Sequence, residues 1–163
     1  MTASPPKIDI NKLRQMISYD PETGFLKWIV PRRGHSAGSP AGYSHRTGYT
    51  FLEIENRHYA GHRVAWAVVH GKWPRYIDHI NGNRSDNRLA NLREATWQQN
   101  QANRPTFKNN HAGIKGVRFD HRHGKWQARI RQKHLGYFET AEEASAAYGR
   151  AAVLAYGDFA RPI

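Results

Sequence analysis

The sequence predicts an α+β protein in which a strand-loop-strand-helix module is followed by a three-stranded antiparallel sheet packed on one helix. Three observations support this fold class. Short aromatic and β-branched segments alternate with turn residues along much of the chain, which is typical of small strands. Apolar residues recur at helical spacing in GHRVAWAVVHGKWP, and TAEEASAAYGRAAVLAYG has both a helix start signal and a closing glycine.

The first sixty residues form the first expected region, a small β-rich one. Turn pairs such as Asp-Pro and Thr-Gly separate pieces of strand length in YDPETGFLKWI, SPAGYSHRTGYTFLEI and RHYAGHRVAW. We expect small antiparallel strands around Trp28, Tyr49 and Phe51. No candidate site residue falls in this region, which we expect to have a packing and DNA-flanking role.

Residues 61–104 form the second region, and they begin with a helix that Gly71 and Pro74 end. Its apolar face is predicted to consist of Val64, Ala65, Val68 and Val69. RYIDHI then reads as a short strand, NGNRSDN as a loop rich in turn residues, and NLREAT as a second short strand. Thr96 is expected to cap the helix WQQNQANR.

A polar linker is expected at residues 105–113, and a last domain at 114–163. GVRFD, GKWQARIRQ and HLGYF read as its three strands. Thr140 and Glu143 have the spacing of a capping box at the start of the final helix, and Gly157 ends that helix. Small side chains should let the helix lie close to the sheet, on a stripe of Ala144, Ala147, Tyr148, Ala151 and Ala155.

The composition narrows the possible functions. There are 25 Lys and Arg against 13 Asp and Glu, a net charge of +12, which favours a nucleic acid as partner. No cysteine is present, so disulfides and thiolate zinc sites are excluded and any metal must be held by oxygen or imidazole. No apolar run approaches the roughly 18 residues of a membrane span, and MTASPPKIDINKLRQ lacks the apolar segment of a signal peptide. We therefore expect a soluble, intracellular protein with no membrane partner.

The candidate site lies in YIDHINGNRSDNRLANLREATWQQNQAN. Asp78 and His79 are neighbours in a strand and so point to opposite sides, which suits a cation ligand and a base acting on one phosphodiester. Asn100 on the following helix could supply a second oxygen ligand, and Asn103, three residues on, is the alternative. Such oxygen ligands suit Mg²⁺ or Mn²⁺. Asn91 could fix both the loop and the imidazole by hydrogen bonding.

This segment resembles the HNH endonuclease motif, also called the ββα-metal module, in its His-Asn-Asn variant found in phage homing endonucleases. The resemblance implies a DNA endonuclease with His79 as general base, Asn91 orienting it, and Asp78 and Asn100 as metal ligands. It further implies 5′-phosphate and 3′-hydroxyl products, and a phage-encoded protein acting in the cytoplasm of a bacterial host. Many relatives have histidine where this chain has Asn100, so magnesium or manganese is expected here.

Other residues of the same stretch have simpler interpretations. Asn81, Asn83 and Asn87 are interpreted as turn formers, because asparagine tolerates the left-handed region and bonds its own backbone. His62, at the start of the helix before the site, could contact a phosphate or could be a packed structural histidine. His121 and His123 lack the spacing of a metal site and are interpreted as surface or DNA-contact residues.

The last domain concentrates positive charge, with seven Lys or Arg and one acid between residues 115 and 133. Alternation in KWQARIRQ places Trp126, Ala128 and Ile130 on one sheet face and Gln127, Arg129 and Arg131 on the other. KGVRFD, GKWQARI, LGYFETAEEASAAY and YGDFARPI resemble the plant Apetala or ethylene-response-factor DNA-binding domain. The alternation and the resemblance together imply contacts to double-stranded DNA from Lys115, Arg118, Gln127, Arg129, Arg131 and Lys133. Arg129 replaces an acid common in that family, so its base specificity is not carried over.

The main alternative is a non-catalytic, transcription-factor-like DNA-binding protein with a decayed nuclease site, and it would need one of the four site residues to have changed. An RNA-directed nuclease would need aromatic side chains on the exposed sheet face, where Arg and Gln are expected. The sequence leaves the oligomeric state open and favours a monomer. For a monomer with one site we expect a nick in one strand.

Overall fold

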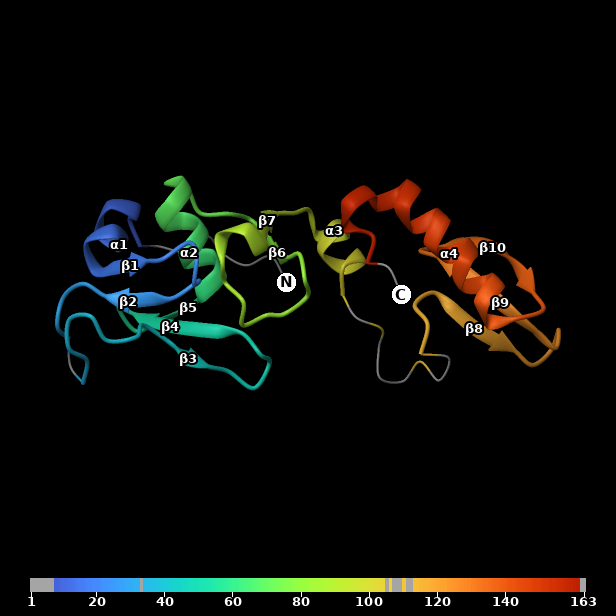
Figure 1. Cartoon of the computed structure of the whole chain (residues 1–163), viewed down its shortest axis with the longest axis horizontal. Coiled ribbons are helices and arrows are strands. Elements are labelled where there is room, and N and C mark those ends of the chain that lie inside the picture. The colour runs from blue at the N-terminus through green and yellow to red at the C-terminus, as the bar shows by residue number, and fades with distance from the viewer. Residues whose placement is uncertain (1–7, 33, 105, 107–109, 111–112, 162–163) are drawn as a thin grey trace. The chain divides into compact units, whose positions relative to one another are not determined.

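The computed structural model describes residues 8–32, 34–104, 106, 110 and 113–161, and Figure 1 traces the chain. These residues form a mixed α and β structure with four helices and several small sheets. They divide into two compact units, Met1–Thr96 and Trp97–Ile163, each described here by itself. The division falls within the expected 61–104 module, between its second strand and its helix. The expected linker at 105–113 lies largely outside the described residues.

The first unit begins with a helix that the strand patterns did not predict. Helix α1 (Ile10–Met16) starts at Asp9, whose side chain accepts hydrogen bonds from the backbone N–H groups of Asn11 and Lys12. Two antiparallel sheets follow and confirm strands at Trp28 and Phe51, while Tyr49 lies just before its strand. They are β1 (Ile17–Tyr19) with β2 (Leu26–Trp28), and β3 (Tyr43–Ser44), β4 (Thr50–Ile54) and β5 (Arg57–Ala60) in the order β3-β4-β5.

Helix α2 (Gly61–His70) ends at Gly71, which takes the left-handed conformation expected of a helix-ending glycine (φ +67°). Val64 and Ala65 are fully buried as predicted, whereas Val69 is 39% exposed because the helix turns it away from the core. The chain then forms the antiparallel pair β6 (Ile77–His79) and β7 (Leu92–Glu94), with a short 3₁₀ turn at Leu89–Asn91 before β7. Thus α2 and the β6-β7 pair come together through Ala65, Ile77 and Leu92.

The second unit contains α3 (Trp97–Ala102) and the predicted three-stranded sheet. Strands β8 (Val117–Asp120), β9 (Lys125–Ile130) and β10 (Lys133–Phe138) are antiparallel in the order β10-β9-β8. Helix α4 (Ala141–Tyr156) lies across this sheet (Figure 1), and a 3₁₀ turn at Gly157–Phe159 follows. The core between helix and sheet contains Val117, Ala128 and Ile130, so the predicted inward face of β9 is confirmed.

The capping box of Thr140 and Glu143 and the closing Gly157 are both confirmed. The predicted stripe was wrong at its end, because Ala155 is exposed. The buried positions are Ala144, Tyr148 and Ala152, which repeat every four residues and so remain on one helix face. Among the described residues, no helix is long and apolar enough to cross a membrane.

Candidate active site

The pairing of β6 with β7 places Asp78 and His79 on opposite faces of a two-stranded sheet. Asp78 lies opposite Arg93 and His79 lies opposite Leu92 in the antiparallel register. Residues directly opposite one another share a face, so Asp78 and Arg93 lie on one side and His79 lies on the other. Both Asp78 and His79 are buried, at 4% and 5% exposed. The predicted separation of the carboxylate from the imidazole is therefore present.

Asp78 forms an ion pair that was not predicted from the sequence. Arg93 donates from Nε at 3.0 Å and from a terminal nitrogen at 2.8 Å, and both bonds end on the carboxylate oxygen Oδ2. The Arg93 side chain is only 18% exposed. Because removing a carboxylate from water is costly, a guanidinium beside it stabilises the buried charge. The register of the two strands would have indicated this partner, had the strand ends been known.

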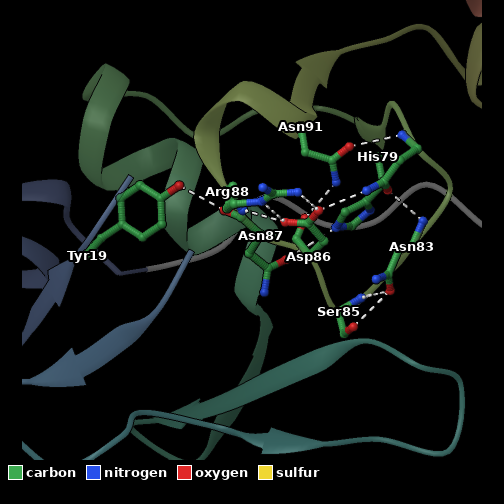
Figure 2. A network of polar contacts seen from close by, with 9 residues as sticks. Tyr19, His79, Asn83, Ser85, Asp86, Asn87, Arg88 and Asn91 are labelled. Carbon is green, nitrogen blue, oxygen red and sulfur yellow. Dashed lines mark hydrogen bonds and ion pairs between the residues drawn. The ribbon is translucent and has the colours of Figure 1, made fainter. Parts of the chain in front are cut away.

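Side chains of the loop between β6 and β7 hold that loop in one conformation (Figure 2). Asn91 accepts a hydrogen bond from the backbone N–H of Asn81 at 2.9 Å, and its amide donates to the backbone oxygen of Asp86 at 2.8 Å. Asn81 and Asn83 accept from backbone N–H groups two residues on, as expected of turn formers. Asn91 therefore fixes the loop, which was one of its two expected roles.

The hydrogen-bond partner of the His79 ring is Asn87, which the sequence assigned to the turn formers. Its amide oxygen lies 3.2 Å from Nε2 of His79 (Figure 2). An amide oxygen only accepts hydrogen bonds, so Nε2 carries the proton and the lone pair of the neutral ring is on Nδ1. Asn87 is 4% exposed, which distinguishes it from the exposed Asn81 and Asn83.

Two contacts from the first sheet hold Asn87 in place. The Tyr19 hydroxyl donates to the Asn87 backbone oxygen at 2.8 Å. Gly24 (φ +76°) approaches the loop so closely that a Cβ there would lie 2.6 Å from the backbone of Asn87 and Arg88. Only glycine fits such a close approach at a positive φ. The β1-β2 turn is thus shaped around the loop that orients His79.

Two aromatic rings pack against the ring of His79. The His62 ring centroid lies 5.0 Å away at 72°, edge to face, and the Tyr49 centroid lies 5.9 Å away. Burial lowers the pKa of His79, while its hydrogen bond to the Asn87 amide oxygen and the charge of Asp78 oppose that shift. Burial also lowers the pKa of His62, to about 3. Both rings are therefore neutral near pH 7, and a neutral imidazole can act as a base.

The expected metal ligands fall in both units. Asp78 lies on β6, while Asn100 is half-buried on α3 and Asn103 is buried just beyond the end of α3. The described residues include no cluster of three or more His, Cys, Asp or Glu side chains able to hold a metal. One carboxylate together with amide oxygens is a hard donor set, of the kind that Mg²⁺ and Mn²⁺ accept alongside water. The chemistry of the expected ligands therefore fits such an ion.

The outer face of the C-terminal sheet carries three of the six expected DNA-contact residues. Arg118 donates from Nε to the Gln127 amide oxygen at 2.9 Å, and the Gln127 amide donates to the Tyr137 hydroxyl at 3.2 Å. Arg129 is exposed on the same face. Sequence reasoning did not place Tyr137 there, with the His123 and His134 rings 4.4 and 4.8 Å from its own. The face thus presents guanidinium groups together with an aromatic group.

Two of the expected DNA-contact residues lie elsewhere. Arg131 donates from Nε to the Tyr156 hydroxyl of α4 at 3.0 Å, so its predicted place on the outer face was wrong. β9 ends at Ile130 and Arg131 is left-handed (φ +54°), which interrupts the strand alternation. Lys115 precedes β8, and its ammonium donates to the backbone oxygens of Gln101, Ala102 and Arg104. The sixth, Lys133, is exposed at the start of β10.

Comparison with known families identifies the part of the chain that contains β6, β7 and α3. Residues 59–102 match the HNH endonuclease family. The match begins in β5 and ends with α3, so it covers His62, Asp78, His79, Asn91 and Asn100 and stops before Asn103. It supports a nuclease. It does not extend to the C-terminal sheet and helix.

Two viral proteins are similar to parts of the chain. Protein 3.8 of Escherichia phage T7 is 35% identical over 71 residues, which are 42% of this chain and 59% of that protein. An uncharacterized HNH endonuclease of Acanthamoeba polyphaga mimivirus is 33% identical over 108 residues, 62% of this chain and 55% of that protein. The matches thus span somewhat more than half the length of each relative. No solved structure matches the chain.

Proposed function

We propose that the chain is a metal-dependent DNA endonuclease of the HNH type, with its C-terminal sheet binding double-stranded DNA. The observation that carries the proposal is the arrangement at β6. His79 is buried, its pKa is lowered by burial, and its Nε2 is bonded to Asn87, while the Asp78 carboxylate lies on the other face of the same strand. Both residues lie inside the segment that matches the HNH endonuclease family.

In the proposed reaction His79 acts as the general base. Nδ1 of its neutral ring takes a proton from the attacking water, while Nε2 keeps its own proton through the Asn87 hydrogen bond. Asn91 holds the loop between β6 and β7 in shape. Asp78 and Asn100 would hold Mg²⁺ or Mn²⁺, with Asn103 as the alternative to Asn100. A bound ion of this kind neutralises charge that develops on the leaving oxygen.

DNA as substrate is supported by charge and by side-chain placement. The chain carries a net charge of +12, and Arg118, Arg129 and Lys133 are exposed on the C-terminal sheet. Guanidinium groups in this position can contact phosphates and guanine edges, and the paired Gln127 amide limits how Arg118 can move. Homing in a phage setting is the proposed biological role, since both relatives are viral.

The test is a supercoiled-plasmid assay with Mg²⁺ or Mn²⁺, with and without a chelator. We expect open-circular or linear product from the wild-type protein and none with chelator or in His79→Ala. His58→Ala is the matched control, because His58 is an exposed histidine on β5 and should leave cutting unchanged. DNA binding without cutting, measured by gel shift on the same plasmid, would show instead a non-catalytic DNA-binding protein.

A further inference from the structure

His62 is a buried side chain that the proposed reaction does not yet use. It is the second residue of α2, and its side chain is 9% exposed. Its ring is packed edge to face against the His79 ring, with centroids 5.0 Å apart at 72°. The Tyr49 ring lies 5.2 Å from His62 and 5.9 Å from His79, so the three rings form one cluster. The His62 ring therefore touches the proposed base directly.

The nitrogen Nδ1 of His62 is buried and, among the residues that the structure describes, has no hydrogen-bond partner. Burying such an atom without a partner destabilises the folded state. A residue that only filled space would avoid this cost if it were aliphatic. An aliphatic side chain would fill this position but would lack a flat ring. The edge-to-face contact with His79 indicates that the ring of His62 is what the position requires.

The neighbours of His79 constrain its ring in two different ways. The Asn87 contact acts on one atom, because Nε2 donates to the amide oxygen, and this bond sets the tautomer. Rings in contact prefer edge-to-face or offset arrangements, so packing against His62 and Tyr49 restricts that plane. Arg84 supports the cluster from outside, since its guanidinium lies 4.9 Å over the Tyr49 ring and donates to the Thr47 backbone oxygen at 3.0 Å.

We propose that His62 is a positioning residue, whose buried ring sets the plane of the His79 ring and so aims the Nδ1 lone pair at the attacking water. The proposal rests on the nuclease function proposed above. It assigns His62 no contact with the substrate and no proton to carry, and its low pKa of about 3 agrees with a ring that stays uncharged. It also selects between the two sequence-based interpretations of His62, in favour of packing over a phosphate contact.

The test compares three variants in single-turnover plasmid cutting and in gel shifts without divalent ion. His62→Leu keeps similar volume but removes the ring, and misplacing the base should slow cutting by about tenfold or more while DNA affinity is unchanged. His62→Phe keeps a ring without nitrogen and should retain most of the rate. His70→Leu is the matched control, because His70 is an exposed histidine on the same helix, stacked on Trp66 rather than on His79.

A second measurement reads the plane of the His79 ring itself, by proton NMR contacts between the His79 and Tyr49 rings, whose centroids lie 5.9 Å apart. We expect the same ring-to-ring contacts in the wild type and in His62→Phe, and averaged or lost contacts in His62→Leu. Equal cutting by wild type and His62→Leu, or equal loss in a folded His62→Phe, would overturn the proposal. If the wild type cuts no DNA, the nuclease function fails, and the NMR comparison still decides whether His62 positions His79.

Discussion

Arg93 donates two hydrogen bonds to a single oxygen of Asp78, across the β6-β7 pair. The Asp78 carboxylate is expected to hold a metal ion. It is also paired with a positively charged side chain of its own sheet. These two bonds hold the carboxylate in a defined orientation. The ion pair stabilises the buried charge and orients it at the same time.

Replacing Arg93 should destabilise the protein strongly. Arg93→Gln leaves the 4% exposed Asp78 without its positive partner, and breaking a buried pair of this kind costs on the order of 3 kcal/mol. Urea unfolding followed by tryptophan fluorescence measures the loss. Lys72→Gln is the control, since it breaks the exposed ion pair of Lys72 with Glu94 on β7 and should cost less than about 1 kcal/mol. Equal losses in the two variants would contradict this view of Asp78.

Divalent ions should offset part of the loss in Arg93→Gln. If Asp78 binds Mg²⁺, the ion supplies the positive charge that the variant lacks, so Mg²⁺ should raise the unfolding midpoint more in Arg93→Gln than in wild type. Asp78→Asn lacks the carboxylate and should show no such rise. Thermal unfolding with Mg²⁺ or with chelator makes the comparison, and an equal rise in Asp78→Asn would place the ion elsewhere.

Asn87→Ala should slow DNA cutting while Asn83→Ala should not. The Asn87 amide oxygen accepts from Nε2 of His79, whereas the Asn83 side chain accepts from the backbone N–H and hydroxyl of Ser85 within its own turn. Losing a side chain that orients a catalytic histidine typically costs about 10- to 100-fold in activity. Both changes remove one asparagine amide from the same loop, so the loop composition is matched. Single-turnover cutting rates measure the difference, and equal rates would mean that Asn87 does not act through His79.

The role of Asn87 could not be predicted from the sequence. The opposite faces of Asp78 and His79 follow from strand alternation, and the turn roles of Asn81 and Asn83 follow from local chemistry, so both could be predicted. Asn87 is the same residue type in the same loop. Only its burial beneath Tyr19 and the close approach of Gly24, both distant in sequence, give it a different role.

The C-terminal domain shows the same limit in its details. The capping box and the alternation of β9 through Ile130 depend on neighbours in sequence, and both are present. Arg131 does not follow the predicted alternation, because the strand ends one residue earlier. The end of a strand depends on the turn that follows it. The contacts of Lys115 could not be predicted from its neighbours, because its partners at the end of α3 lie more than ten residues away in the chain. Helix α1 had a readable signal in its capping residue, Asp9.

Protonation of Asp86 in acid should destabilise the loop between β6 and β7. Hydrogen bonds from Arg88 hold the pKa of Asp86 well below its usual range. A carboxylate whose pKa is lowered by folding stabilises the folded state above its unfolded-state pKa of about 3.9, and that stability is lost as the pH falls through the folded-state value. The stability difference between wild type and Asp86→Asn should therefore be constant near neutral pH and shrink below about pH 4. Urea midpoints measured across this range test it, and a difference independent of pH would contradict it.

Lys115 and Lys133 should respond in opposite ways to the same change, lysine to methionine. The Lys115 ammonium donates to three backbone oxygens at the end of α3, so Lys115→Met leaves these acceptors unsatisfied and should cost roughly 1–3 kcal/mol in urea unfolding. Lys133 is exposed on β10, so Lys133→Met should cost less than about 0.5 kcal/mol.

DNA binding should depend on Lys133 more than on Lys115, which is the reverse of their order in stability. If Lys133 contacts a phosphate, Lys133→Met should weaken binding and reduce the salt dependence of the affinity by about one released ion. Lys115→Met should leave that slope unchanged, because its ammonium is already bound within the domain. Each variant removes one positive charge, so a general effect of net charge would change both slopes equally. Gel shifts at several salt concentrations separate the cases, and equal slopes would mean that the C-terminal domain binds DNA through its overall charge.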